Sequence, residues 1–362
     1  MFLKNCWYVA AWDYELIDGK MLARTLLNEN VLLYRGDSGE VIALNNRCPH
    51  RGALLSDGRR EGDDVRCMYH GIKYNKDGRC LQIPGQDMIP PKLRVRKYPI
   101  VESARLIWIW MGDPARADRT LIPEYAPLHD PKWRGLPAYL HYDANYLLIV
   151  DNLSDFSHLA FVHTNTLGGS EEYAYVTKPV VVEKQERGFR VDRWHMNSEA
   201  PPFHKKVIRD KDARVDRRNH VTMLIPGIFY METTFTPAGQ GAEKGNLENA
   251  REYRNCQYMT PETDRTTHFF WVYLNNFEGT DTTISASLLD SLIEGFLEDK
   301  AIIERQQKTL EEDPNFQMLG ILADAPLAHF RRVLDKLIQA EQEPPAGTVP
   351  AAAGAAKQTS LA

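Results

Sequence analysis

Short runs of apolar residues recur through the first 118 residues of the chain. They include residues 31–35, 41–46 and 106–112, and turn-forming segments such as GDSGE and NKDG lie between them. Apolar runs separated by Gly, Asn and Asp are typical of short β-strands. The pattern therefore predicts an all-β domain over residues 1–118, and the segment WIWMGDP with the polar residues after it marks the end of this domain.

After residue 118 the pattern mixes strand-like and helical segments. A helix is predicted to begin near Tyr146, and strand-like runs alternate with polar loops over residues 176–274. A long helix follows at about 284–312 and a last one at about 327–341. Asp313-Pro314 ends the longer helix, because the residue before proline disfavours helical backbone. We predict an α+β fold with a second domain at residues 119–342.

One side of the long helix is apolar. Residues three and four apart share a helix face, so this stripe is predicted to cover the core of the second domain. The stripe consists of Leu288, Leu289, Leu292, Ile293, Phe296 and Leu297. The tail, residues 343–362, is rich in Pro, Ala and Gly and is predicted to be disordered.

Two loops of the second domain are predicted from composition alone. Residues 204–220, HKKVIRDKDARVDRRNH, are dense in charge and are predicted to form a solvated, mobile connection. A docking surface for a partner is the alternative for this segment. Residues 237–252 are rich in Gly and are predicted to be an exposed loop.

The overall composition is that of a globular protein, with 43% hydrophobic and 26% charged residues. A net charge of −5 gives no indication of nucleic-acid binding. The chain has no apolar run of about 18 residues that could span a membrane, and its N-terminus lacks a signal-peptide pattern. The five cysteines form no obvious disulfide framework, which predicts a reducing, cytoplasmic location.

Two pairs of metal-binding residue types lie close together in the first domain. Cys48 and His50 form one pair, Cys67 and His70 form the other, and sixteen residues separate them. Each loop offers one thiolate and one imidazole. This division suits a Rieske [2Fe–2S] cluster, in which two thiolates bind one iron and two imidazoles bind the other.

A zinc site with two cysteines and two histidines is the alternative, since zinc tolerates many spacings. Structural zinc sites usually group their cysteines in one loop and their histidines in another, unlike the two loops here. Gly52 and Gly71 come just after the histidines, where backbone that bends closely around a cluster cannot carry a Cβ atom. The sequence therefore favours the [2Fe–2S] centre.

A second group of candidate ligands lies in the helical segment DNLSDFSHLAFVH. It contains Asn152, Asp155, His158 and His163. On a regular helix the two histidines are about 140° apart. Both can reach one metal ion only if a π-turn bulges the helix or if the helix ends between them. Asp155 and His158 are three residues apart and share a face.

Together the two motifs resemble those of the Rieske non-haem iron oxygenases. The segments CPHRG and CMYHG resemble the cluster loops, and N-x2-D-x2-H-x4-H resembles the mononuclear iron motif. The segments KNCWYVAAW, RCPHRGALLSDG, GDPARAD and VDNLSDFSH resemble the group with only an α subunit, which contains vanillate and dicamba O-demethylases and toluenesulfonate methyl-monooxygenase. The resemblance covers about residues 1–340.

The resemblance implies an N-terminal Rieske domain and a C-terminal catalytic domain with a curved antiparallel sheet and covering helices. Pro84-Gly85-Gln86 resembles the loop that covers the cluster, although a simple turn is equally consistent with these residues. The cofactors implied are a [2Fe–2S] Rieske cluster and a mononuclear non-haem Fe(II). The cluster ligands implied are Cys48, His50, Cys67 and His70.

For the mononuclear iron, the resemblance implies a triad of two histidines and one carboxylate, namely His158, His163 and Asp299. Glu298, Glu294 and Asp290 are alternatives for the carboxylate. Asn152 and Asp155 are expected to serve catalysis. Asp155 is expected to bridge His158 and a Rieske histidine of a neighbouring subunit through its carboxylate.

The resemblance also implies partners and a reaction. We expect a homotrimer served by a separate NAD(P)H-dependent reductase that carries flavin and a [2Fe–2S] cluster, since no G-x-G-x-x-G pattern occurs in this chain. The expected reaction is O2-dependent O-demethylation or methyl hydroxylation of a substituted aromatic acid. An aromatic-ring cis-dihydroxylating dioxygenase is the first alternative, and a non-catalytic electron carrier or zinc-binding protein is the second.

Substrate contacts are predicted only as candidates. The pocket is expected to involve strands around 221–235, 253–260 and 268–275. An acidic substrate favours an Arg, His or amide within an otherwise apolar cavity. The candidate residues are Gln257, Trp271, Asn275, His195 and His204.

Overall fold

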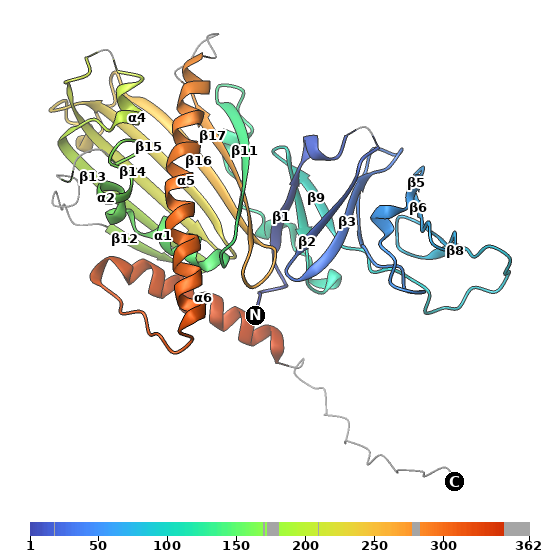
Figure 1. Ribbon diagram of the computed structural model, residues 1–362. Coiled ribbons are helices and arrows are strands. Elements are labelled where there is room, and N and C mark those ends of the chain that lie inside the picture. The colour runs from blue at the N-terminus through green and yellow to red at the C-terminus, as the bar shows by residue number, and fades with distance from the viewer. Residues whose placement is uncertain (18, 169–170, 172–180, 209, 277–282, 344–362) are drawn as a thin grey trace.

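The computed structural model describes residues 1–343 except 18, 169–170, 172–180, 209 and 277–282. Two parts lie side by side: a β-rich N-terminal part, and a larger sheet crossed by helices (Figure 1). The predicted fold class is confirmed by this arrangement. The predicted disordered tail lies, apart from Glu343, outside the described residues.

The N-terminal part consists of three antiparallel sheets with strand orders β1-β10-β9, β2-β3-β4 and β5-β6-β7-β8. Every residue of β1 and β10 is buried, and for this reason both strands are continuous apolar runs rather than alternating ones. The strands are β1 Trp7–Trp12, β2 Met21–Leu26, β3 Glu29–Arg35, β4 Val41–Asn45, β5 Arg59–Glu61, β6 Asp64–Arg66, β7 Lys73–Tyr74, β8 Cys80–Gln82, β9 Ile100–Ser103 and β10 Leu106–Trp110.

The second part contains a seven-stranded antiparallel sheet with strand order β11-β17-β16-β15-β14-β13-β12. Its two faces have different neighbours. Tyr230 and Tyr258 on one face pack with Trp108 of the N-terminal part. The strands are β11 Arg134–Tyr142, β12 Val181–Gln185, β13 Gly188–Glu199, β14 Arg214–Leu224, β15 Ile228–Pro237, β16 Arg251–Pro261 and β17 Thr267–Asn275.

The other face of this sheet is covered by helices, of which α5 is the longest (Figure 1). Trp271 of β17 meets Phe296 of α5 with ring centroids 4.8 Å apart. The helices are α1 Tyr146–Ser154, α2 Leu159–Val162, α4 Pro202–Lys205, α5 Thr283–Glu312 and α6 Ala325–Gln342. The helices predicted near Tyr146, at 284–312 and at 327–341 are therefore confirmed.

The apolar stripe predicted on α5 is correct except at its last residue. Leu288, Leu292 and Phe296 are buried, whereas Leu297 is 47% exposed. Position 297 follows Phe296 directly, so it is turned by about 100° toward solvent. The predicted stripe was one residue too wide.

The prediction of a solvated, mobile connection at residues 204–220 is wrong for its last part, because residues 214–220 belong to strand β14, which lies inside the sheet between β13 and β15. Residues 206–208 and 210–213 lie outside helices and strands and connect α4 to β14. Arg218 pairs with Asp192 at 2.6 Å, while the neighbouring Arg217 and Asn219 are buried on the helix-covered face. Successive strand residues point to opposite faces, so a charge-dense sequence can supply both a surface ion pair and a buried polar group. The Gly-rich loop at 237–252 is mostly exposed, as predicted.

In the described part of the chain, none of the helices combines the length and the apolar character needed to cross a membrane. We propose a boundary between the two parts near residue 118, because the segment between β10 and β11 consists of short 3-10 turns and loops.

Replacing Leu288 by Ala is expected to destabilise the protein, because Leu288 is fully buried between α5 and the sheet. The expected loss is about 2–5 kcal/mol, as for other leucines in tightly packed cores. Leu297→Ala on the same helix is the matched control, with an expected change within about 0.5 kcal/mol. Urea unfolding of both variants gives the comparison, and equal midpoints would contradict the packing described for α5.

Candidate active site

The two cysteine-histidine loops have closely similar backbones. The amide of Gly52 donates to the carbonyl of Cys48 at 2.9 Å, and the amide of Gly71 donates to that of Cys67 at 3.0 Å. Both glycines have positive φ, +73° and +72°, which residues with a Cβ rarely adopt. These turns bury both cysteine side chains.

The histidines of the same loops are exposed and lie together. The rings of His50 and His70 have centroids 4.5 Å apart. Pro84 lies directly over the second loop, since a Cβ on Gly71 would come within 2.9 Å of its Cγ atom. The predicted covering role of residues 84–86 therefore has a close contact to support it.

The surroundings of Cys48 and Cys67 suit the binding of a metal cluster. Burial raises the pKa of the Cys67 thiol, and the neighbouring Cys48 raises it further. The hydroxyl of Tyr74 lies 3.2 Å from the Cys48 sulfur and can donate to a thiolate there. Two buried, adjacent thiolates require nearby positive charge, which a bound cluster would provide.

The second candidate site begins where helix α1 ends. Asp155 has extended backbone, and its carboxylate accepts a hydrogen bond from the amide of Ser157 at 2.8 Å. A short 3-10 turn, Phe156–His158, follows, and α2 then ends at His163. Because the helix breaks at Asp155, the two histidines do not share one regular helix. The described segment contains neither of the two expected arrangements: it has no π-turn, and helix α1 ends before His158 rather than between the two histidines.

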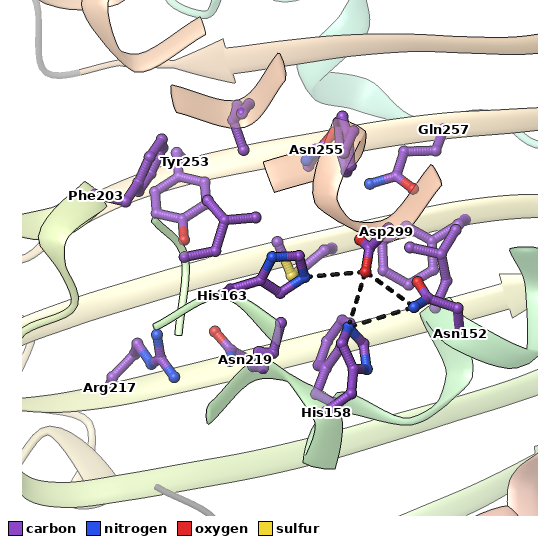
Figure 2. Close-up of a pocket in the computed structure, with 18 residues that line it drawn as sticks. Asn152, His158, His163, Phe203, Arg217, Asn219, Tyr253, Asn255, Gln257 and Asp299 are labelled. Carbon is purple, nitrogen blue, oxygen red and sulfur yellow. Dashed lines mark hydrogen bonds and ion pairs between the residues drawn. The ribbon is translucent and has the colours of Figure 1, made fainter. Parts of the chain in front are cut away.

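The interruption brings the two imidazoles together with a carboxylate of α5. His158 Nε2 lies 3.5 Å from Asp299 Oδ1, and His163 Nε2 lies 3.1 Å from the same oxygen (Figure 2). The ligand atoms of His158, His163 and Asp299 all lie within 4.8 Å of one another. His163 and Asp299 are buried, and His158 is partly buried.

A hydrogen bond at Nδ1 of each imidazole determines that its Nε2 atom faces the Asp299 carboxylate. His158 Nδ1 lies 2.6 Å from the carbonyl oxygen of Asp155, and His163 Nδ1 lies 2.6 Å from Glu298 Oε2. Both Nδ1 atoms therefore carry the proton, and both Nε2 atoms present a lone pair. Two lone pairs and a carboxylate oxygen repel one another unless a cation lies between them, so these residues fit a metal ion.

The pKa values of the two histidines are shifted in opposite directions. Burial is the main cause of the lowered pKa of His158, which the Asp299 carboxylate only partly offsets. Burial also opposes protonation of His163, but hydrogen bonds and charge from Asp299 and Glu298 outweigh it and raise the pKa. Metal binding requires the unprotonated Nε2 in both rings.

The predicted alternatives to Asp299 occupy different positions. Glu298 binds His163 and also accepts from the hydroxyl of Thr166 at 2.7 Å, so it orients a histidine. Glu294 and Asp290 are exposed on α5. Asp299 is therefore the one of these four carboxylates that faces both histidine Nε2 atoms.

Asn152 belongs to the same group. Its amide nitrogen donates to Asp299 Oδ1 at 3.0 Å and lies 3.5 Å from His158 Nε2 (Figure 2). It can thereby fix the orientation of the Asp299 carboxylate.

The expectation that the Asp155 carboxylate would bind His158 is wrong within this chain. The Asp155 main-chain carbonyl does so instead, because the carboxylate caps the turn at Ser157.

A cavity opens beside the three candidate ligands. Apart from the ligands and a few polar groups, its walls are apolar. The lining side chains include Leu153, Phe156, Leu159, Leu167, Phe203, Phe229, Met231, Leu292 and Phe296. Such a cavity suits an aromatic molecule.

The predicted pocket residues differ in where they lie. Gln257 lines the cavity, whereas Trp271 is covered by Phe296 and Asn275 donates to the hydroxyl of Ser285 at 2.9 Å. His204 is buried behind the cavity wall, 2.8 Å from the hydroxyl of Tyr253. His195 lines a small neighbouring cavity.

Sequence analysis missed Arg217, Asn219 and Asn255, all of which line the main cavity. Arg217 and Asn219 lie in the segment that was predicted to be a loop. The signal that could have found these two residues is the spacing of Val215, Val221 and Met223, which places positions 217 and 219 on the same apolar face of a strand. The many charges of the segment concealed it.

Comparisons with known proteins cover nearly the whole chain. The family model of the Rieske [2Fe–2S] domain matches residues 6–99. The family model of the vanillate O-demethylase oxygenase C-terminal domain matches residues 142–340. Each match coincides with one of the two parts of the fold and contains one of the two candidate sites.

Similar proteins are found among both sequences and solved structures. The chain is 44% identical to the iron-sulfur subunit of a toluene-4-sulfonate monooxygenase system from Comamonas testosteroni, over 97% of this chain and all of that protein. It is 32% identical to a vanillate O-demethylase oxygenase subunit from a Pseudomonas species, over 95% and 97% of the two chains. The crystal structure of dicamba monooxygenase bound to 3,6-dichlorosalicylic acid matches with a TM-score of 0.86 and 30% identity, over 94% and 98%.

Replacing Asp299 by Ala is expected to abolish tight binding of a divalent metal ion, because the two remaining imidazoles no longer share a carboxylate partner. Metal content after anaerobic loading with Fe(II) and removal of excess metal gives the measurement. The colour of the cluster in the N-terminal part should be unchanged.

Glu294→Ala is the matched control, since this carboxylate lies on the same helix but is exposed. It should bind the same amount of metal as the parent protein. If Asp299→Ala also retains full metal content, the third ligand is another carboxylate of α5.

Proposed function

The chain belongs to the Rieske non-haem iron oxygenase family, and from this premise we propose that it oxidises a methyl or methoxy group of a substituted aromatic acid. It is the oxygenase component of a monooxygenase system and contains a Rieske [2Fe–2S] domain. The observation that carries the proposal is the convergence of His158, His163 and Asp299 at the wall of an apolar cavity.

The proposed metal at this triad is mononuclear Fe(II). Two histidines and one carboxylate with open coordination positions are the ligand set of non-haem iron oxygenases. Activation of O2 for attack on a C–H bond is the chemistry that such an iron supplies when bound. Asp155 and Glu298 hold the histidine tautomers, and Asn152 orients the carboxylate.

The remaining task of the protein is to place the substrate. The apolar walls exclude water and can hold an aromatic ring against the triad. If the oxidised carbon is an aryl methyl group, the product is an alcohol. If it is a methoxy group, the product collapses to a phenol and formaldehyde. Relatives that match along nearly their whole length include proteins named as a monooxygenase subunit and as O-demethylases, which supports this reaction over ring dihydroxylation.

Electrons must reach the triad from outside this chain. We propose a separate NAD(P)H-dependent reductase with flavin and a [2Fe–2S] cluster as the donor. The cluster is proposed to be held by the buried Cys48 and Cys67 and the exposed His50 and His70. The exposed histidines support electron transfer through this face.

A homotrimer is proposed as the functional assembly. The metal loops near β5–β8 and the segment α1–α2 lie at well-separated places in one chain (Figure 1). Since electrons tunnel efficiently only over short distances, this separation supports transfer between subunits that meet head to tail.

The proposed cytoplasmic location rests on the five unpaired cysteines.

The substrate proposal predicts that the protein, supplied with a matched reductase and NADH, oxidises aromatic acids that carry a methyl or methoxy group. The measurement compares 4-methylbenzenesulfonate with 4-methoxybenzoate, scoring alcohol against formaldehyde. One atom of labelled oxygen from O2 should enter the product. Two labelled atoms in a ring diol would contradict the monooxygenase reaction for this protein.

Asp155→Asn is expected to leave both metal sites filled, because the main-chain carbonyl still accepts from His158. We propose that the Asp155 carboxylate accepts a hydrogen bond from a Rieske histidine of the neighbouring subunit, so loss of its charge should slow reoxidation of the reduced cluster by about 10–100-fold. Asparagine caps a helical turn as well as aspartate does, so the turn at Ser157 is kept while the charge is lost. Stopped-flow absorbance of the cluster after mixing with O2 and substrate gives the rate. Ser157→Ala, which removes only the hydroxyl bound to Asp155, is the control and should behave like the parent.

A further inference from the structure

Strand β14 places a positively charged side chain in the wall of the substrate cavity. Arg217 is only 3% exposed and lines this cavity. Figure 2 shows it at one side of the cavity, with Asn152 at the opposite side and the triad between them and nearer to Asn152. Among the described residues that line the cavity, Arg217 carries the one permanent positive charge.

Arg217 also belongs to a second, smaller cavity. Arg193 and His195 of the neighbouring strand β13 line that cavity together with Arg217. The register of the sheet pairs His195 directly with Arg217. The same guanidinium therefore forms part of the boundary of both cavities, and a second arginine lies close behind it.

The positive potential at this place affects its neighbours. Burial, with the charges of Arg217 and Arg193, lowers the pKa of His195 to about 3. Burial and Arg217 also lower the pKa of His204. The two histidines are thus neutral at pH 7, so the charge of this region comes from the arginines.

Among the described lining residues, the positive and negative side chains of the main cavity are Arg217 and Asp299, which lie on different elements. Asp299 is the one carboxylate among the described residues that line either cavity, and it belongs to the triad. Asn219, two residues from Arg217 on the same strand face, accepts from the hydroxyl of Thr233 through its amide oxygen at 3.0 Å. That bond occupies the oxygen of Asn219, so its NH2 group is the end available as a donor.

We propose that Arg217, assisted by Asn219, binds the anionic group of the substrate, a sulfonate or carboxylate. This inference rests on the proposed function, because it assigns one end of the aromatic substrate to Arg217 and the methyl or methoxy end to the triad. A planar guanidinium with a neighbouring amide donor suits a group with two or three acceptor oxygens. The apolar walls between hold the ring.

The amides Asn255 and Gln257 are further polar groups of the cavity, in addition to Asn152 and the hydroxyl of Tyr253. They lie on β16, and the register places Gln257 level with Met223, six residues along β14 from Arg217. Six residues of strand correspond to roughly 20 Å of backbone. Gln257 therefore lies in a different part of the cavity from Arg217, and neither neutral amide can replace the charge of Arg217 for an anion.

The test compares an anion with a neutral molecule of nearly the same shape. The dissociation constants of 4-methylbenzenesulfonate and 4-methylbenzenesulfonamide are measured by calorimetry on the anaerobic holoprotein, and kcat/KM is measured with a reductase. In Arg217→Met, affinity and kcat/KM for the sulfonate should fall by about 100-fold, while the values for the sulfonamide change less than about threefold. 4-Methylbenzoate in place of the sulfonate shows which anion the site prefers.

Two further variants sharpen the comparison. Arg217→Lys keeps the charge without the planar fork, so it should bind the sulfonate about tenfold more weakly and still prefer it to the sulfonamide. Arg218→Met is the matched control, because this arginine is on the same strand but pairs with Asp192 away from the cavity. It should leave both constants unchanged.

The results for these variants either support or overturn the assignment of Arg217 as the anion-binding residue. If Arg217→Met keeps the preference for the sulfonate, or if Gln257→Leu abolishes that preference instead, the assignment of Arg217 is overturned. If Arg217→Met does not fold, the parent protein provides the decision: equal affinity for sulfonate and sulfonamide also overturns it. Tight, Arg217-dependent binding of an anion that is never oxidised would support the assignment and refute the proposed reaction.

Discussion

Three electron-pair donors that face one another in a buried space form the constraint on which the second part of the protein depends. His158 Nε2, His163 Nε2 and Asp299 Oδ1 would repel one another without a cation. Behind the rings, His158 Nδ1 donates to the Asp155 carbonyl and His163 Nδ1 donates to Glu298. The Asn152 amide donates to Asp299 Oδ1 itself. The broken helix and the long helix α5 can be understood as the supports of this arrangement.

The seven-stranded sheet separates two kinds of packing. One face is fixed against tryptophans of the N-terminal part, and this contact joins the two parts of the chain. The opposite face, under α5, forms one wall of the apolar cavity beside the triad. Because successive strand residues alternate between faces, a single strand such as β14 contributes Arg218 to a surface ion pair and Arg217 to the cavity.

In the two metal loops, the cysteine side chains are buried and the histidine side chains are exposed. Their glycines close two equivalent turns, which bury Cys48 and Cys67 and leave His50 and His70 at the surface. The thiolate side of a cluster bound there would be shielded from water, and its imidazole side would face a partner. Electron transfer can then occur at this surface without exposure of the sulfur ligands.

Local sequence was sufficient for the parts of the protein that depend on neighbouring residues. The short strands of the N-terminal part, the cluster loops, helices α1, α5 and α6, and the histidine motif could all be predicted, since each rests on spacing within one segment. The choice of Asp299 over Glu298 came from the family resemblance. Geometry then placed Asp299 against both histidine Nε2 atoms and Glu298 behind His163.

Tertiary structure decided what depends on several segments at once. His158 ends a 3-10 turn and His163 follows the one-turn helix α2, so the two histidines do not lie on one regular helix, which would separate them. The Asp155 carboxylate caps the turn that carries His158. Arg217 and Asn219 looked like parts of a solvated loop, because composition records how many charges a segment carries and not which face each one occupies. Only the pairing of β14 between β13 and β15 determines that Arg217 faces the cavity, since the register of a sheet is set by its neighbouring strands.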